Sequence, residues 1–226
     1  MDQLQPSWQS ADRGIEARVA FIRSVYAWLM AGFGVACLGA FLSPLTVAPL
    51  AALAGQYFIW VLFFIQMGSI FFAQAVSRKK PLNILAYGIF TFVSGTIAGI
   101  VSYLVASQAG PGTVFLALGL TAAVFLTLTV IAFVTKKDFS FLRSFVLVGL
   151  AVMFFGGLAA AIFHLSTFSL VVSGVAVIAC SAKLLWDTSA LLHTADFSNP
   201  AGAALSLFVS LYNIFISLLN ILGRRR

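Results

Sequence analysis

Two charged residues lie close together at the end of a long apolar run, and they are the first candidates for chemistry. Lys183 and Asp187 stand four residues apart in the sequence. Residues at this spacing share one face of a helix, so the ammonium and the carboxylate can neutralise each other. Ionisable residues within a membrane-spanning helix are functional candidates by default. The alternative is that both side chains reach out to the lipid headgroups, and the sequence leaves both interpretations open.

A line of polar residues in the last apolar run is the second candidate. They recur at intervals of four, three, four and three residues, which places them on one face of a helix: Ser206, Ser210, Asn213, Ser217 and Asn220. Because polar groups do not face hydrocarbon without cost, this face must contact protein or a water-filled cavity. Hydrogen bonds between helices are the simpler interpretation, and an ion pathway is the more specific one.

Motifs typical of enzymes and metal sites are absent from the sequence. The patterns HExxH, GxxxxGK[ST] and GxSxG do not occur. Asp187, His193 and Asp196 follow no standard metal-ligand spacing, so we expect solvated loop residues there rather than a metal centre. The two cysteines, Cys37 and Cys180, lie within apolar runs and are expected to pack rather than to form a disulfide. We therefore predict no catalytic site, no cofactor and no metal.

The elements that position these residues must lie in lipid. Of 226 residues, 62% are hydrophobic and 8% are charged, whereas soluble domains carry about 25% charged residues. The 13 Lys and Arg residues form short clusters separated by long uncharged runs, which excludes a continuous nucleic-acid-binding stripe. The composition predicts a membrane protein that has the lipid bilayer, and no nucleic acid, as a partner.

Seven apolar runs are long enough to cross a bilayer, since a hydrocarbon core of about 30 Å needs about 20 helical residues. The predicted spans are 24–43, 50–76, 82–106, 113–134, 144–163, 168–186 and 203–222. The remaining segments are too short for a soluble domain. We expect an all-α membrane protein with a polar tail over 1–23, a seven-helix domain over 24–223 and three basic residues at 224–226.

Basic residues alternate between the loops and predict the orientation of the chain. They precede the first span and follow the second and fourth, whereas loops 44–49, 107–112 and 164–167 have none. The positive-inside rule then places the N-terminal tail in the cytoplasm. The first run is also too long for a signal-peptide core, so we expect no cleaved leader.

The orientation of the C-terminus follows from whether the last run crosses the membrane. Seven crossings place the basic residues 224–226 outside, against the rule, and a re-entrant last segment would bring them inside. A full span is preferred because 203–222 contains no charged residue.

Small residues indicate where the helices approach one another. Helices in lipid associate through small residues that let their backbones come close. The predicted packing faces contain Gly95 and Gly99 with Gly88 one heptad earlier, Gly149 and Gly156, and Gly32, Ala36 and Ala40.

Three segments resemble the Bax inhibitor family. The run from Thr135 to Leu142, TKKDFSFL, resembles the family's T-[TK]-[KR]-[KR]-D-[FLM]-S segment, and Trp186-Asp187-Thr188 is similar to its aromatic-Asp-Thr signature. The most specific match is 204–223, which resembles the bacterial YccA-like branch and has the sequence SLYNIF from Ser210 where many relatives have an Asp. The resemblance implies a seven-helix fold in which the last helix is central and wrapped by the other six.

The resemblance also bears on ion conduction. In family members that leak calcium, it implies a gate of two aspartates, in spans six and seven, aided by an Arg in span two. Asp187 matches the first aspartate, Ser210 stands in the place of the second, and span two contains no Arg. A serine cannot share a proton with a carboxylate as a second acid does. The departure disfavours an acid-gated calcium channel and favours the role implied for the YccA-like branch, regulation of the membrane-anchored AAA protease FtsH.

Two functional hypotheses result. The preferred one is a protein of the bacterial inner membrane that binds FtsH and slows its attack on other membrane proteins, as an inhibitor or as a competing substrate entered from the tail. The alternative is a pH-sensitive calcium leak lined by spans six and seven, with Asp187 as the binding or gating residue. A purely structural membrane partner remains if both fail.

Overall fold

Every long apolar run of the chain forms an α-helix, because a backbone in lipid must satisfy its own hydrogen bonds. The structure is a computed structural model, and it describes residues 7–193 and 196–224. Their helices are α1 (Ser7–Ala54), α2 (Phe58–Val76), α3 (Leu82–Ala109), α4 (Pro111–Thr135), α5 (Arg143–Ile162), α6 (Ser166–His193) and α7 (Pro200–Gly223), with short 3-10 turns η1 (Gly55–Tyr57) and η2 (Ser140–Leu142). All seven α-helices are long and apolar enough to cross a membrane, as the sequence predicts.

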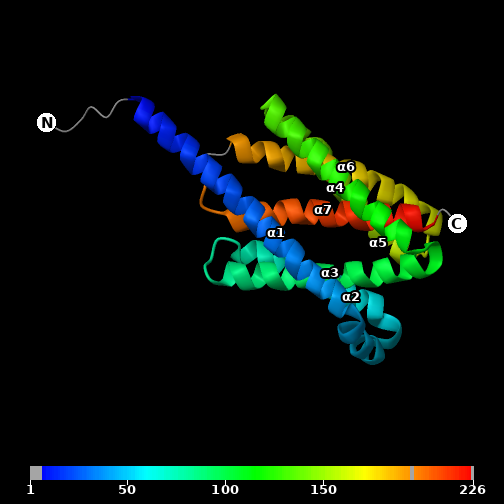
Figure 1. Ribbon diagram of the computed structural model, residues 1–226. Helices are drawn as coiled ribbons and strands as arrows, with labels where there is room; N and C mark the ends of the chain where they lie inside the picture. The colour runs from blue at the N-terminus through cyan, green and yellow to red at the C-terminus, as the bar shows by residue number, and fades with distance from the viewer. Residues whose placement is uncertain (1–6, 194–195, 225–226) are drawn as a thin grey trace.

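Helix α7 lies in the middle of the bundle (Figure 1). It contacts α1, α2, α3, α4 and α6, while α5 packs on α6. Its side chains pack into an aromatic cluster in which Phe208 lies 5.5 Å from Phe33 of α1 and 5.8 Å from Phe90 of α3, measured between ring centroids. The predicted all-α fold with a central last helix is confirmed.

The prediction of a loop at 44–49 is wrong. Helix α1 continues through Pro44 and Pro49 as far as Ala54, so residues 50–54 of the predicted span 50–76 belong to α1 and α2 begins only at Phe58. The chain turns instead at Gly55, whose φ of 52° lies in the left-handed region that glycine adopts at little cost. Prolines usually mark a helix boundary, but here a glycine that can reverse the backbone ends the helix.

Two further boundaries differ from the prediction. The tail expected over 1–23 is helical from Ser7 onward, and the first turns of α1 extend beyond the other helices (Figure 1). The span expected to end at Trp186 continues to His193. Leu191 is buried two turns after the buried Leu184, so an apolar face holds this end of α6 against the bundle. Asp187 therefore lies within a helix and not at the start of a loop.

Close backbone contact joins α1 to α3 at the predicted GxxxG pair. A Cβ added to Gly95 would lie 2.5 Å from the Cα of Ala36, and one added to Gly99 would lie 2.7 Å from the carbonyl oxygen of Ala40. Gly88 has no such neighbour within 4 Å, so its inclusion in the packing face is wrong.

Close contact at glycines also joins α5 to α6. A Cβ on Gly149 would lie 2.5 Å from the Cβ of Ala179, and one on Gly156 would lie 2.9 Å from Val172 Cγ2. The predicted packing role of these two glycines is confirmed.

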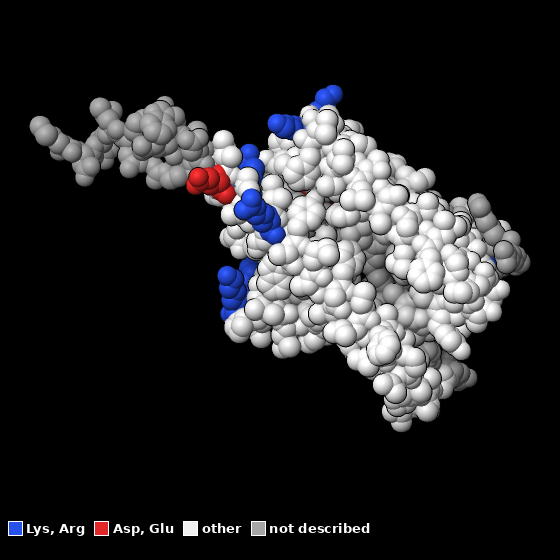
Figure 2. Space-filling model, viewed as in Figure 1, with Lys and Arg blue, Asp and Glu red and all other residues white. Residues whose placement is uncertain are grey.

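The basic clusters gather at one end of the bundle, which we call the basic end. Ser189 of α6 donates to the Lys137 carbonyl oxygen, and Arg78 pairs with Asp196, so the α4–α5 and α2–α3 turns both lie beside the end of α6. Figure 2 shows the Lys and Arg side chains of this face gathered at the end of the molecule where α1 begins. Arg224 follows α7 at the opposite end and donates to the Ser166 carbonyl oxygen at the start of α6.

Candidate functional site

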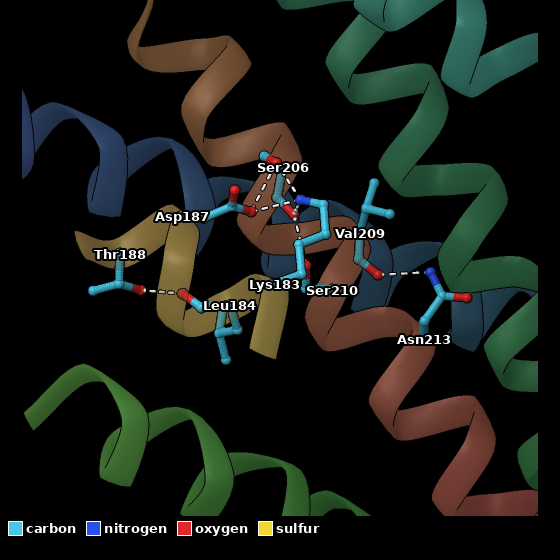
Figure 3. Close-up of polar contacts among 8 residues, drawn as sticks. All are labelled: Lys183, Leu184, Asp187, Thr188, Ser206, Val209, Ser210 and Asn213. Atoms are coloured by element: carbon cyan, nitrogen blue, oxygen red, sulfur yellow. Dashed lines mark hydrogen bonds and ion pairs between the residues drawn. The ribbon is translucent and has the colours of Figure 1, made fainter. Parts of the chain in front are cut away.

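Lys183, Asp187 and Ser206 form a closed polar triad between α6 and α7 (Figure 3). The Lys183 Nζ lies 2.5 Å from Asp187 Oδ2 and donates to Ser206 Oγ, also at 2.5 Å. The Ser206 hydroxyl in turn donates to Asp187 Oδ2 at 2.8 Å. Each of the three residues is therefore bonded to the other two.

The triad is turned into the protein rather than toward the lipid surface. The Lys183 and Asp187 side chains are 15% and 17% exposed. Both side chains turn toward α7, because the Ser206 hydroxyl offers the ammonium a partner inside the bundle. Ammonium and carboxylate neutralise each other there, which keeps an uncompensated charge out of a region of low dielectric.

Two cavities reach the triad from the basic end. One of about 250 Å³ is lined by Asp187 and Ser206 together with Arg78, Asp196 and Asn199. The other, of about 190 Å³, also ends at Ser206. The triad thus separates the interior of the bundle from small cavities that open at the basic end.

Arg78 and Asp196 face each other on the wall of the larger cavity, with Arg78 Nη2 lying 3.2 Å from Asp196 Oδ2. Hydrogen bonds from Ser198, together with the charge of Arg78, hold the pKa of the Asp196 carboxyl below its ordinary value. This pair links the α2–α3 turn to the segment between α6 and α7.

The next polar residues of α7 bond to their own helix. The Ser210 hydroxyl donates to the Ser206 carbonyl oxygen at 3.2 Å, and Asn213 Nδ2 donates to the Val209 carbonyl oxygen at 2.8 Å (Figure 3). Ser210 is fully buried and Ser217 is buried. Both serines are therefore part of the packed interior.

Asn220 belongs to a separate cluster near the opposite end of α7. Its Nδ2 donates to Ser169 Oγ at 2.9 Å and to Ser173 Oγ at 2.7 Å, both on α6. Ser206 and Asn220 are 14 residues apart in the helix, which corresponds to about 21 Å along its axis. The predicted stripe therefore supplies two polar clusters and not one site.

Several polar residues at the ends of the cavities and helices are missing from the sequence prediction. Asn199 caps α7 by accepting from Gly202 N at 2.9 Å, and it also donates to Ser77 Oγ at 3.3 Å. An Asn followed by Pro200 at the first helical position is a recognisable start signal. The sequence offers no such signal for Gln66, whose Nε2 donates to Ser94 Oγ at 3.0 Å. Only the crossing of α2 and α3 brings these two residues together.

The three residues considered as metal ligands have other partners. Asp187 pairs with Lys183 and Asp196 with Arg78, while His193 Nδ1 lies 2.9 Å from the Ser189 carbonyl oxygen within α6. Within residues 7–193 and 196–224, no group of three His, Cys, Asp or Glu side chains is arranged to hold a metal ion.

Comparison with known proteins shows which family this chain belongs to. The model of the family described as "Inhibitor of apoptosis-promoting Bax1" (Bax1-I) matches residues 18–226. An uncharacterized protein of Campylobacter jejuni is 32% identical over 203 residues, covering 89% of this chain and 87% of that protein. The protein named "Modulator of FtsH protease YccA" of Escherichia coli K12 is 36% identical over 166 residues, covering 72% of this chain and 74% of that protein.

These descriptions name an inhibitor and a modulator rather than an enzyme. A further relative at the same identity and coverage, from another Escherichia coli strain, is named "Inner membrane protein YccA". The match to the family model, over residues 18–226, includes most of α1, all of the other six α-helices and the whole triad. The chain is a seven-helix membrane protein that belongs to the Bax inhibitor family.

Proposed function

We propose that this protein modulates FtsH in a bacterial inner membrane. The observation that carries the proposal is the 36% identity to the modulator YccA over 166 residues. The triad supports it, because Asp187 is already paired with Lys183 and Ser206, and the serine at position 210 is buried where a second acid would be needed for a paired-carboxylate gate. A regulator needs no open ion path.

We further propose that the basic end, with the start of α1, faces the cytoplasm. The clustering of Lys and Arg at this end follows the positive-inside rule. An AAA protease engages its substrates and regulators from the cytoplasm, and the projecting first turns of α1 (Figure 1) offer it a helical segment. The proposed contact is therefore the helical part of the polar tail predicted over 1–23.

The proposal is tested by cross-linking in native membranes followed by co-purification. The intact protein should recover FtsH, and its overproduction should lengthen the lifetime of membrane proteins that FtsH degrades. A variant lacking residues 2–14 should still insert into the membrane but lose both effects. A matched control replaces 2–14 with an unrelated polar helical sequence of equal length. If no FtsH is recovered and substrate lifetimes stay unchanged, the proposal fails.

A calcium leak is the second candidate, and the cavity that reaches Asp187 from the basic end is the observation in its favour. Proteoliposomes loaded with a calcium-sensitive dye test it directly. A flux above that of empty liposomes, abolished by Asp187→Asn, would support conduction. A flux no greater than in empty liposomes at either neutral or acidic pH would remove this candidate.

A further inference from the structure

We propose that the Lys183 ammonium is a built-in cation, which occupies a position whose oxygen atoms would otherwise hold a sodium ion. The inference concerns the triad alone and does not depend on whether the protein modulates FtsH. It predicts a cation-binding site that appears when the lysine charge is removed.

The atoms around the ammonium are the first support. Lys183 Nζ is bonded to a carboxylate oxygen of Asp187 and to the hydroxyl oxygen of Ser206, and it lies 3.5 Å from the Ser206 carbonyl oxygen. Carboxylate, hydroxyl and backbone carbonyl oxygens are the donors that hard cations take in proteins. The hydrogen bonds of Nζ all go to oxygen atoms, so the ammonium sits in a set of ligands suited to a metal cation.

Charge selects the kind of cation. Asp187 is the only carboxylate in the triad, and one positive charge balances it. A monovalent ion restores the neutrality that Lys183 provides, whereas a divalent ion would leave a net positive charge beside a largely buried site. We therefore assign sodium, and not calcium, as the ion that the vacated position would take.

Access from water is the third support. The cavities of about 250 Å³ and about 190 Å³ both reach Ser206, and the larger one is also lined by Asp187. An ion can therefore approach from the basic end without crossing the apolar core. The tether on Lys183 gives the ammonium an advantage over dissolved ions, because its binding within the same helix costs no loss of translational freedom.

The test compares the detergent-purified protein with Lys183→Met, in sodium chloride and in choline chloride of equal ionic strength. Thermal unfolding should be independent of sodium in the unchanged protein. In Lys183→Met, sodium should raise Tm by about 5 °C or more, because a ligand bound only by the folded state stabilises it by mass action. Calcium chloride is the comparator, and it should have a smaller effect.

Two further variants separate an ion site from a general weakening of the fold. Lys183→Met/Asp187→Asn removes the uncompensated carboxylate, and it should unfold at the same temperature in both salts. Lys137→Met removes an exposed lysine from the turn beside α6 and should also be insensitive to sodium. Radiolabelled sodium should bind to Lys183→Met and to neither of these variants.

Each outcome decides the proposal. Equal Tm values for Lys183→Met in sodium and choline, together with no sodium binding, would show that the triad is a simple ion pair and would overturn it. Stronger stabilisation by calcium than by sodium would overturn the assignment of a monovalent ion. If Lys183→Met fails to accumulate even when sodium is present, while the double variant folds, the vacated position takes no ion and the proposal is wrong.

Discussion

Ser206 supplies the hydroxyl that joins the two charges of the triad, and its contribution can be isolated. Ser206→Ala removes the bond donated to the Asp187 carboxylate and the bond accepted from Lys183. A hydrogen bond to a charged group contributes about 1.5–3 kcal/mol, so we expect unfolding to become easier by about 2 kcal/mol. Reversible unfolding in mixed micelles measures this.

Ser210→Ala is the matched control for Ser206→Ala. Its hydroxyl is more deeply buried than that of Ser206 but bonds only to a carbonyl oxygen of its own helix. Loss of such a local bond should change the unfolding free energy by less than about 1 kcal/mol. Equal effects of the two substitutions would contradict the triad as the main polar contact between α6 and α7.

We expect the contribution of Asp196 to stability to change with pH only under acidic conditions. Because the pKa of its carboxyl is lowered in the folded protein, the stabilisation is present above the ordinary carboxyl pKa, about 3.9, and is lost as the pH falls through the lower folded value. Thermal unfolding should separate the unchanged protein from Asp196→Asn by a constant Tm difference between pH about 5 and about 8. This difference should shrink only below pH about 4.

Helix pairs show which small residues control assembly. Gly95→Ala places a methyl group against the backbone of Ala36, where neither helix can give way without moving the other. Overpacking of this kind costs about 1–3 kcal/mol. Gly88→Ala, in the same helix but facing open space, should be neutral or slightly stabilising because alanine favours the helix. Unfolding measurements on both variants check the contrast, and similar losses would mean that the α1–α3 contact is looser than described.

The contact between the far ends of α6 and α7 depends on Asn220. Asn220→Leu removes the bonds to Ser169 and Ser173 and leaves two hydroxyls without that donor. Hydrogen bonds between membrane helices contribute about 0.6 kcal/mol on average, so we expect a loss of about 1 kcal/mol for the two. The triad lies about 21 Å away, so Lys183→Met should keep its dependence on sodium when combined with Asn220→Leu.

The molecule as a whole has one basic end and one end with few charges, which makes its orientation testable. Single cysteines at Lys80 and Arg224, introduced after replacement of Cys37 and Cys180 by alanine, report the two ends. α7 runs from Asn199, beside Ser77 at the basic end, to Arg224, beside Ser166 at the other end. A membrane-impermeant maleimide applied to intact cells with a permeabilised outer membrane should label position 224 and not position 80. Labelling of neither would restore the re-entrant alternative for α7.

Local composition and spacing are enough to derive the surrounding medium, the number of helices that can cross it and the polar face of the last helix. The shortage of charge requires lipid, lipid requires helices that satisfy their own backbone bonds, and helical periodicity identifies a polar face. These properties follow from local composition and spacing, so they can be derived without knowing which helices are neighbours. The helix ends cannot be derived in this way. The residues around Pro44 and Pro49 are mostly apolar on both sides, so the sequence does not indicate that α1 continues through both prolines and that the chain turns at Gly55.

The hydrogen-bond partners of the polar side chains depend on how the helices pack in three dimensions. Lys183 and Asp187 are four residues apart in any helix, but their contact with Ser206 depends on where α6 crosses α7. The packing of α7 along α6 likewise places Ser206 with the triad and Asn220 with Ser169 and Ser173. Periodicity gives the direction in which a side chain points from its own axis. Which side chain it meets depends on the packing of two helices, and that is set by all the contacts of the bundle together.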